Sequence, residues 1–72
     1  MELELRIEDN KYQIRVSSLI NLENELKFKS ELLSMTISTF DYRKNYIANT
    51  IEESVSLLTK ELQRALRELL EL

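Results

Sequence analysis

The 72-residue sequence contains no cysteine, histidine, glycine, proline or tryptophan. Without cysteine there is no disulfide, and without cysteine or histidine the usual ligands of a zinc site are missing. Glycine is the residue that tight turns with positive φ use most readily, and proline is the main helix breaker. Because both are absent, the composition favours long, uninterrupted helices.

Charge excludes further classes of protein. Ten basic and thirteen acidic residues are interspersed along the chain and give a net charge of −3. Nucleic-acid-binding domains usually gather a basic excess on one face, and membrane-surface helices carry lysine and arginine on their polar side. No apolar run approaches the roughly 20 residues of a membrane span, and no basic start precedes an apolar segment as in a secretory signal. We therefore expect no nucleic-acid partner, no membrane contact and a cytoplasmic location.

The strongest periodic signal is a heptad repeat between residues 47 and 72. Apolar residues recur on two adjacent rows, a pattern typical of a helix. One row contains Ala48, Val55, Leu62 and Leu69, and the other contains Ile51, Leu58, Ala65 and Leu72. A further set, Leu57, Leu66 and Leu70, lies beside this seam. A single facing helix would not cover that set, and contiguous exposed apolar surface usually marks a contact site.

Residues 17–35 also show a helical pattern. Two acid-first pairs at (i, i+4) spacing, Glu23 with Lys27 and Glu25 with Lys29, favour a helix by a few tenths of a kcal/mol each. Lys29 interrupts an apolar row that consists of Leu19, Leu22, Leu26 and Leu33. Residues of low helix propensity follow at positions 36–39, where a break is expected. Ser38 and Asp41 resemble a capping box that would start the next helix.

The first 16 residues are consistent with two structures. Leu3, Leu5 and Ile7 alternate with charged residues, and the segment from Tyr12 to Val16 alternates again, which indicates a β-hairpin with Asp9-Asn10 at its turn. The same apolar residues also fit neighbouring stripes of a helix. We favour the helix, because a lone two-stranded ribbon is marginal without a cover and no glycine is available for the turn. The β-hairpin stays open as the alternative.

Together these patterns predict an all-α fold in one domain, residues 1–72. Two long antiparallel helices would form a coiled-coil-like helical hairpin, with helix 1 at about 2–36, a break at about 36–40 and helix 2 at about 40–71. A chain this short, without a disulfide or metal, usually gains stability by dimerising or by binding a partner. We therefore expect a homo-oligomer when the protein is alone.

The residue types present argue against catalysis. Glu52 and Glu53 are adjacent acids, but neighbours on a helix point about 100° apart and do not share a proton or a metal easily. Phosphate-binding loops need glycine. We therefore predict no enzyme, no catalytic residue, no cofactor and no metal.

Partner binding is the remaining kind of function. Tyr46 either closes the end of the hairpin or anchors a partner, since tyrosine is enriched at binding hot spots. The leucines beside the heptad seam are either covered by the first helix or form an interface. The candidate partner-binding residues are Tyr46, Leu57, Leu66 and Leu70.

Several short blocks resemble the needle-protein co-chaperones of type III secretion systems, of the YscE, PscE and EscE type. The blocks are Leu3-Glu4, Asn10, a Leu-Glu-x-x-Leu stretch with lysines at residues 22–29, Asp41-Tyr42 and the apolar run at residues 51–58. The resemblance implies a helical hairpin and a virulence-related role. It also implies that the protein binds and stabilises a tetratricopeptide-repeat-like chaperone, and that the two keep the needle subunit monomeric before export.

Two other functions stay open. The chain would be a self-associating coiled coil with a structural or adaptor role if the apolar rows pair between copies. It would be a ribbon-helix-helix DNA-binding protein if the N-terminus is extended and two helices follow. The acidic balance counts against DNA binding.

Overall fold

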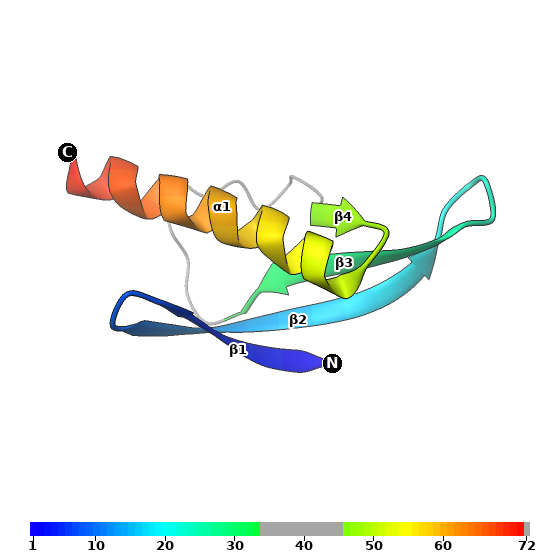
Figure 1. Ribbon diagram of the computed structural model, residues 1–72, viewed down its shortest axis with the longest axis horizontal. Coiled ribbons are helices and arrows are strands. Elements are labelled where there is room, and N and C mark those ends of the chain that lie inside the picture. Colours follow the sequence, from blue (N-terminus) through cyan, green and yellow to red (C-terminus); the bar gives the residue numbers. More distant parts are fainter. Residues whose placement is uncertain (34–45, 72) are drawn as a thin grey trace.

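The computed structural model describes residues 1–33 and 46–71. Four strands form one antiparallel sheet in the order β1-β2-β3-β4, and a C-terminal helix lies across one face of it (Figure 1). The elements are β1 (Glu2–Ile7), β2 (Asn10–Ile20), β3 (Leu26–Leu32), β4 (Tyr46–Ala48) and α1 (Ile51–Leu70). The predicted all-α helical hairpin is therefore wrong, since the described part of the region expected to form helix 1 contains three strands.

The first hairpin forms because the folded chain supplies a cover for the ribbon and a turn that does not need glycine. Helix α1 covers the apolar face of the sheet, so β1 and β2 are not a lone ribbon. Register pairs Ile7 with Asn10, which places the turn at Glu8-Asp9, one residue before the expected position. Glu8 adopts a φ of 56°, the region that glycine would normally occupy. The turn thus forms without glycine, at the expense of some backbone strain at Glu8.

The second hairpin replaces the helix predicted at residues 17–35. Asn21 organises its turn: the Asn21 side-chain oxygen accepts hydrogen bonds from the backbone N–H groups of Glu23 and Glu25, at 3.0 and 2.9 Å. Asn24 has a φ of 62°, which asparagine tolerates better than most residues. Beyond the turn, β3 alternates in the order Leu26, Phe28, Ser30 and Leu32, with Lys27, Lys29 and Glu31 between them. This period of two, rather than the (i, i+4) charge pairs, determines the structure.

Helix α1 confirms the C-terminal part of the predicted second helix, but it begins at Ile51 rather than near residue 40. Thr50 caps it, because its hydroxyl oxygen accepts a hydrogen bond from the Glu53 N–H at 3.1 Å. Tyr46–Ala48 is a short strand that pairs with β3. The predicted break at 36–40 and the Ser38–Asp41 capping box lie outside the described residues.

The hydrophobic core lies between α1 and the sheet. Leu58, Leu62 and Ala65 of the heptad seam are fully buried. Their partners come from the sheet rather than from a second helix: Ile7, Tyr12, Ile14, Leu32 and Tyr46. The heptad therefore marked the correct buried face of α1 and predicted the wrong partner for it.

Candidate docking surfaces

The structure separates the four residues expected to bind a partner. Tyr46 is 4% exposed and belongs to the core, so it cannot anchor a partner. Leu66 is half-buried and packs against the same core. Leu57 and Leu70 are 43% and 87% exposed. Of the four, the two exposed leucines are free to make large new contacts.

Leu57 and Leu66 also point to opposite sides of α1. Successive helical residues turn by about 100°, so nine residues amount to two and a half turns. Leu57 accordingly lies in a separate shallow hollow of about 390 Å³ that includes Ala48, Glu53 and Lys60. The three leucines beside the heptad seam are therefore not one surface.

Leu66 and Leu70 line a groove between the C-terminal half of α1 and the turn between β1 and β2. Its volume is about 500 Å³. Leu69 and Ile7 add apolar surface, and Gln63, Arg67, Glu8 and Asn10 supply a polar rim. We call this hollow the C-terminal groove. Gln63, Leu66, Arg67 and Leu70 follow the i, i+3, i+4, i+7 spacing of a helix stripe, the pattern by which one helix packs against another.

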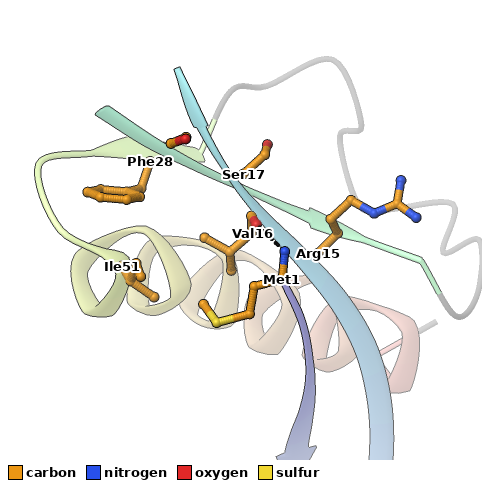
Figure 2. A pocket seen from close by; sticks show the side chains of 7 residues that line it. Met1, Arg15, Val16, Ser17, Phe28 and Ile51 are labelled. Atoms are coloured by element: carbon orange, nitrogen blue, oxygen red, sulfur yellow. Dashed lines mark hydrogen bonds between the residues drawn. The ribbon is translucent and has the colours of Figure 1, made fainter. Parts of the chain in front are cut away.

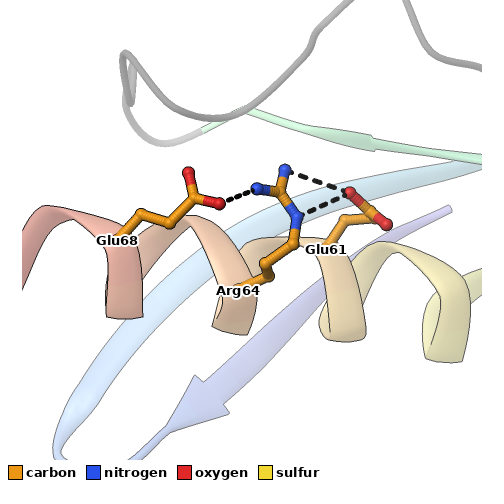
Figure 3. Close-up of polar contacts among 3 residues, drawn as sticks. All are labelled: Glu61, Arg64 and Glu68. Atoms are coloured by element: carbon orange, nitrogen blue, oxygen red, sulfur yellow. Dashed lines mark hydrogen bonds and ion pairs between the residues drawn. The ribbon is translucent and has the colours of Figure 1, made fainter.

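Glu61, Arg64 and Glu68 form a charged network on α1 (Figure 3). At about 100° per residue, Arg64 and Glu68 lie on the side of the helix away from Leu66. The Arg64 guanidinium donates to Glu68 and, at 3.2 and 3.3 Å, to Glu61 Oε2. The hydrogen bond to Glu68, followed by that to Glu61, raises the pKa of Arg64 above its ordinary value. Surface pairs of this kind contribute little to stability. These charged side chains keep their face of α1 in contact with solvent. The groove, with the apolar side chains of Leu66 and Leu70, is on the other side of the helix.

A second exposed apolar region lies at the turn joining β2 and β3. This hairpin projects beyond the rest of the sheet (Figure 1). Ile20, Leu22 and Leu26 are 60%, 106% and 54% exposed there. We call this projecting β2–β3 hairpin, with Ile20, Leu22 and Leu26, the arm. The sequence interpretation placed Leu22 and Leu26 in an apolar row of a helix and therefore did not predict it. Alternation within β3, together with two asparagines at the turn, was the signal that could have revealed it.

The turn of this arm is acidic and ordered by hydrogen bonds. A side-chain hydrogen bond involving Glu23, then one from Asn21 at 3.3 Å, and then the charge of Lys27 lower the pKa of Glu25 below its ordinary value. Glu25 therefore stays ionised over a wider pH range than a free glutamate. Two carboxylates at the tip disfavour the phosphate backbone of a nucleic acid as its partner.

Two buried serines form a polar cluster that the sequence interpretation also missed. The Ser30 hydroxyl donates to the Ser54 backbone carbonyl at 2.9 Å. Ser54 Oγ lies 2.7 Å from the Tyr46 carbonyl oxygen and 3.0 Å from Ser30 Oγ, and its single proton serves one of them at a time. The hydroxyls bond to each other and to main-chain carbonyls, so the cluster ties α1 to β3 and β4.

No family model, curated protein or solved structure matches this chain. Within residues 1–33 and 46–71, no helix is long and apolar enough to cross a membrane. The same residues contain no group of three or more acidic side chains placed to hold a metal ion.

Proposed function

We propose that this protein is a cytoplasmic protein-binding module that docks an amphipathic helix of a partner protein in the C-terminal groove. The observation that carries the proposal is the 87% exposure of Leu70 at the end of a stripe that also contains half-buried Leu66. A leucine exposed to this degree contributes little burial to the isolated fold. It gains roughly 1.5 to 3 kcal/mol if a partner covers it completely.

The helical-stripe spacing of the groove supports a helix as its occupant. A partner helix with apolar residues at i, i+3, i+4 and i+7 presents a complementary ridge, and such grooves commonly bind helices in this way. Glu8 and Arg67 at the rim are of opposite sign and suit the mixed polar face of such a helix.

The narrower co-chaperone hypothesis rests on the residue resemblance alone. Its helical hairpin is absent from the described fold, so neither the chaperone nor the needle subunit gains support from the architecture. The self-associating coiled coil and the ribbon-helix-helix arrangement lose their structural basis too, because the helix seam packs on a sheet and four strands precede α1. Protein binding is the part of the hypothesis that we carry forward.

Leu70→Glu tests this proposal, with Leu57→Glu as the matched control on the opposite side of α1. Each tagged variant is used to recover partners from cells of the source organism, and the recovered proteins are quantified by mass spectrometry. We expect Leu70→Glu to reduce a partner's recovery at least tenfold, which is about 1.4 kcal/mol, while Leu57→Glu leaves it within about twofold. Circular dichroism should show both variants folded.

Sedimentation velocity on the isolated protein covers self-association through the same groove. A concentration-dependent oligomer that Leu70→Glu dissociates would identify a second copy as the occupant. Equal recovery of every partner with wild-type protein and Leu70→Glu, with no change in oligomeric state, would refute the groove as a docking site. Leu66→Glu is unsuitable as a test, because Leu66 packs against the core and the charge would destabilise the fold.

A further inference from the structure

The edge of β2 extends beyond the strand that protects it. Strand β1 pairs with β2 from Ile7↔Asn10 to Glu2↔Arg15. Met1 adds one last pair, since its N-terminal ammonium donates to the Val16 carbonyl at 3.0 Å and its carbonyl accepts from the Val16 N–H at 2.7 Å. Beyond Val16, β2 continues to Ile20 with β3 on one side only. We call residues 17–20 on the other side the open edge.

The backbone groups that face the open edge follow from the ladder. In an antiparallel strand, alternate residues direct their N–H and C=O groups to the same neighbour. Val16 directs both groups toward β1, so Ser18 and Ile20 direct theirs to the open edge. Odd-numbered residues of β2 direct their groups to β3 instead. The Gln13 carbonyl, for example, accepts a hydrogen bond from the Leu33 N–H at 2.8 Å on that side. Among the described residues, no strand pairs with Ser18 or Ile20 on that edge.

A hollow of about 510 Å³ lies next to the open edge (Figure 2). Phe28, which is opposite Ser18 in the register, and Ile51 at the start of α1 form apolar walls. Met1 and Val16 close the end where β1 stops. Figure 2 shows β2 running past Met1, with Phe28 and Ile51 on the helix side. The small Ser18 side chain leaves this space free for a larger side chain on an adjacent strand.

The side chains of the open edge carry none of the charges that usually protect a strand edge from pairing. The Met1 ammonium and Arg15 line the hollow at the end where β1 stops. Exposed edges commonly carry charged side chains that discourage strand addition. Strand β1, at the edge of the sheet, carries Glu2, Glu4 and Arg6, which are all exposed. Residues 17–20 are Ser-Ser-Leu-Ile, with no charge. This edge is therefore compatible with pairing in a way that β1 is not.

We propose that the open edge binds an extended peptide segment of a partner protein by strand addition, in line with β1. The backbone of the peptide would pair with the N–H and C=O groups of Ser18 and Ile20. A large apolar side chain would enter the hollow over Ser18 and contact Phe28 and Ile51. Main-chain pairing supplies affinity and the hollow supplies side-chain selectivity, as in other strand-addition sites. This site is separate from the C-terminal groove and does not depend on it.

The proposal can be tested with a defined probe peptide of nine residues with acetylated and amidated ends. Valine and a central phenylalanine alternate with threonine, and lysine at each end keeps the peptide soluble. Amide hydrogen exchange is followed by NMR on the full chain. We expect the Ser18 and Ile20 amides to exchange at least roughly tenfold more slowly at saturating peptide. The Ser17 and Leu19 amides face β3 and serve as internal controls that change little.

Variants of Ser18 distinguish edge pairing from adventitious contact. Ser18→Pro removes the outward N–H without removing a ladder hydrogen bond to β3, and Ser18→Lys adds an edge charge in case proline disturbs folding. We expect either variant to weaken binding at least tenfold, on the order of 1.4 kcal/mol. Ser56→Lys, at an exposed serine of α1 that does not line the hollow, should stay within about twofold. A peptide with alanine in place of phenylalanine should bind at least fivefold more weakly.

Three results would overturn the proposal. The first is no protection of Ser18 and Ile20 at peptide concentrations of about 1 mM, the weak end of specific binding. The second is equal binding by wild type, Ser18→Lys and Ser56→Lys. The third is concentration-dependent protection of the same amides in the protein alone, which would make a second copy the occupant. Because Leu70 is remote from this edge, failure here leaves the C-terminal groove proposal unaffected.

Discussion

Ser54→Ala gives the sharpest test of how α1 is attached to the sheet. Ser54 is fully buried, and its hydroxyl lies 2.7 Å from the Tyr46 carbonyl oxygen. In the helical hairpin expected from the heptad, position 54 is off the seam and alanine would be harmless. In the observed fold, alanine removes a buried hydrogen bond that connects α1 with β4.

The size of the effect follows from burial and from a matched control. Removing one partner of a buried hydrogen bond costs about 1 to 3 kcal/mol. Alanine also raises helix propensity, and this gain is shared by Ser56→Ala, an exposed serine on the same helix. The difference in unfolding free energy between the two variants therefore isolates the buried cluster. We expect Ser54→Ala to be less stable than Ser56→Ala by about 1 to 3 kcal/mol.

Urea denaturation followed by circular dichroism measures this difference directly. Thermal unfolding should agree, with a lowering of Tm by roughly 4 to 8 °C per kcal/mol in a domain of this size. Ser30→Ala combined with Ser54→Ala should give a smaller loss than the sum of the two single losses, because the hydroxyls are 3.0 Å apart. Equal stability of Ser54→Ala and Ser56→Ala would refute the conclusion that the buried Ser54 hydroxyl attaches α1 to the sheet.

The other predictions concern the core and the first turn. Leu62→Ala should destabilise the protein by about 2 to 5 kcal/mol in urea denaturation, because Leu62 is fully buried; Leu57→Ala, at a 43% exposed position, should cost far less, and equal losses would contradict the burial assignment. Glu8→Gly should stabilise the protein by up to about 1 kcal/mol, because glycine relieves the positive φ at this turn residue. Asp9→Gly, at a residue without positive φ, should be neutral or destabilising, and the reverse order in Tm would contradict the turn geometry.

Several features of the fold were accessible from the sequence. The heptad predicted a helix over the C-terminal third and identified Leu58, Leu62 and Ala65 as its buried face. The alternation from Leu3 to Val16 contained the β-hairpin as an open alternative. Thr50 and Glu53 form a threonine-x-x-glutamate cap that the sequence displays, although the interpretation placed the cap at Ser38.

The wrong predictions of a helix in place of the two hairpins arose because local sequence patterns do not report tertiary packing. The (i, i+4) pairs at residues 23–29 suggested a helix, yet each is worth a few tenths of a kcal/mol and burial on the sheet outweighs them. The absence of glycine suggested that tight turns were disfavoured. Glu8 and Asn24 adopt positive φ instead, at a cost that tertiary packing offsets.

The structure places the four predicted partner-binding residues in different surroundings. Leu66 and Leu70 do lie together in one groove. Tyr46 is instead a core residue, and Leu57 points to the other side of α1. The arm could have been predicted from the alternation within β3 and the asparagines at its turn. The open edge of β2 was not predictable, because it depends on where β1 and β2 end relative to one another.

The sequence by itself determined the short-range properties of this protein: a capped amphipathic helix near the C-terminus, an acidic balance and alternation in the first 16 residues. The tertiary structure alone decided what the apolar faces pack against. Helix α1 covers strands some 40 residues earlier in the chain, and that cover makes an otherwise marginal ribbon stable. It also decided which apolar groups stay exposed, because Leu70 packs outside the core between α1 and the sheet, and β2 continues past its last pair with β1.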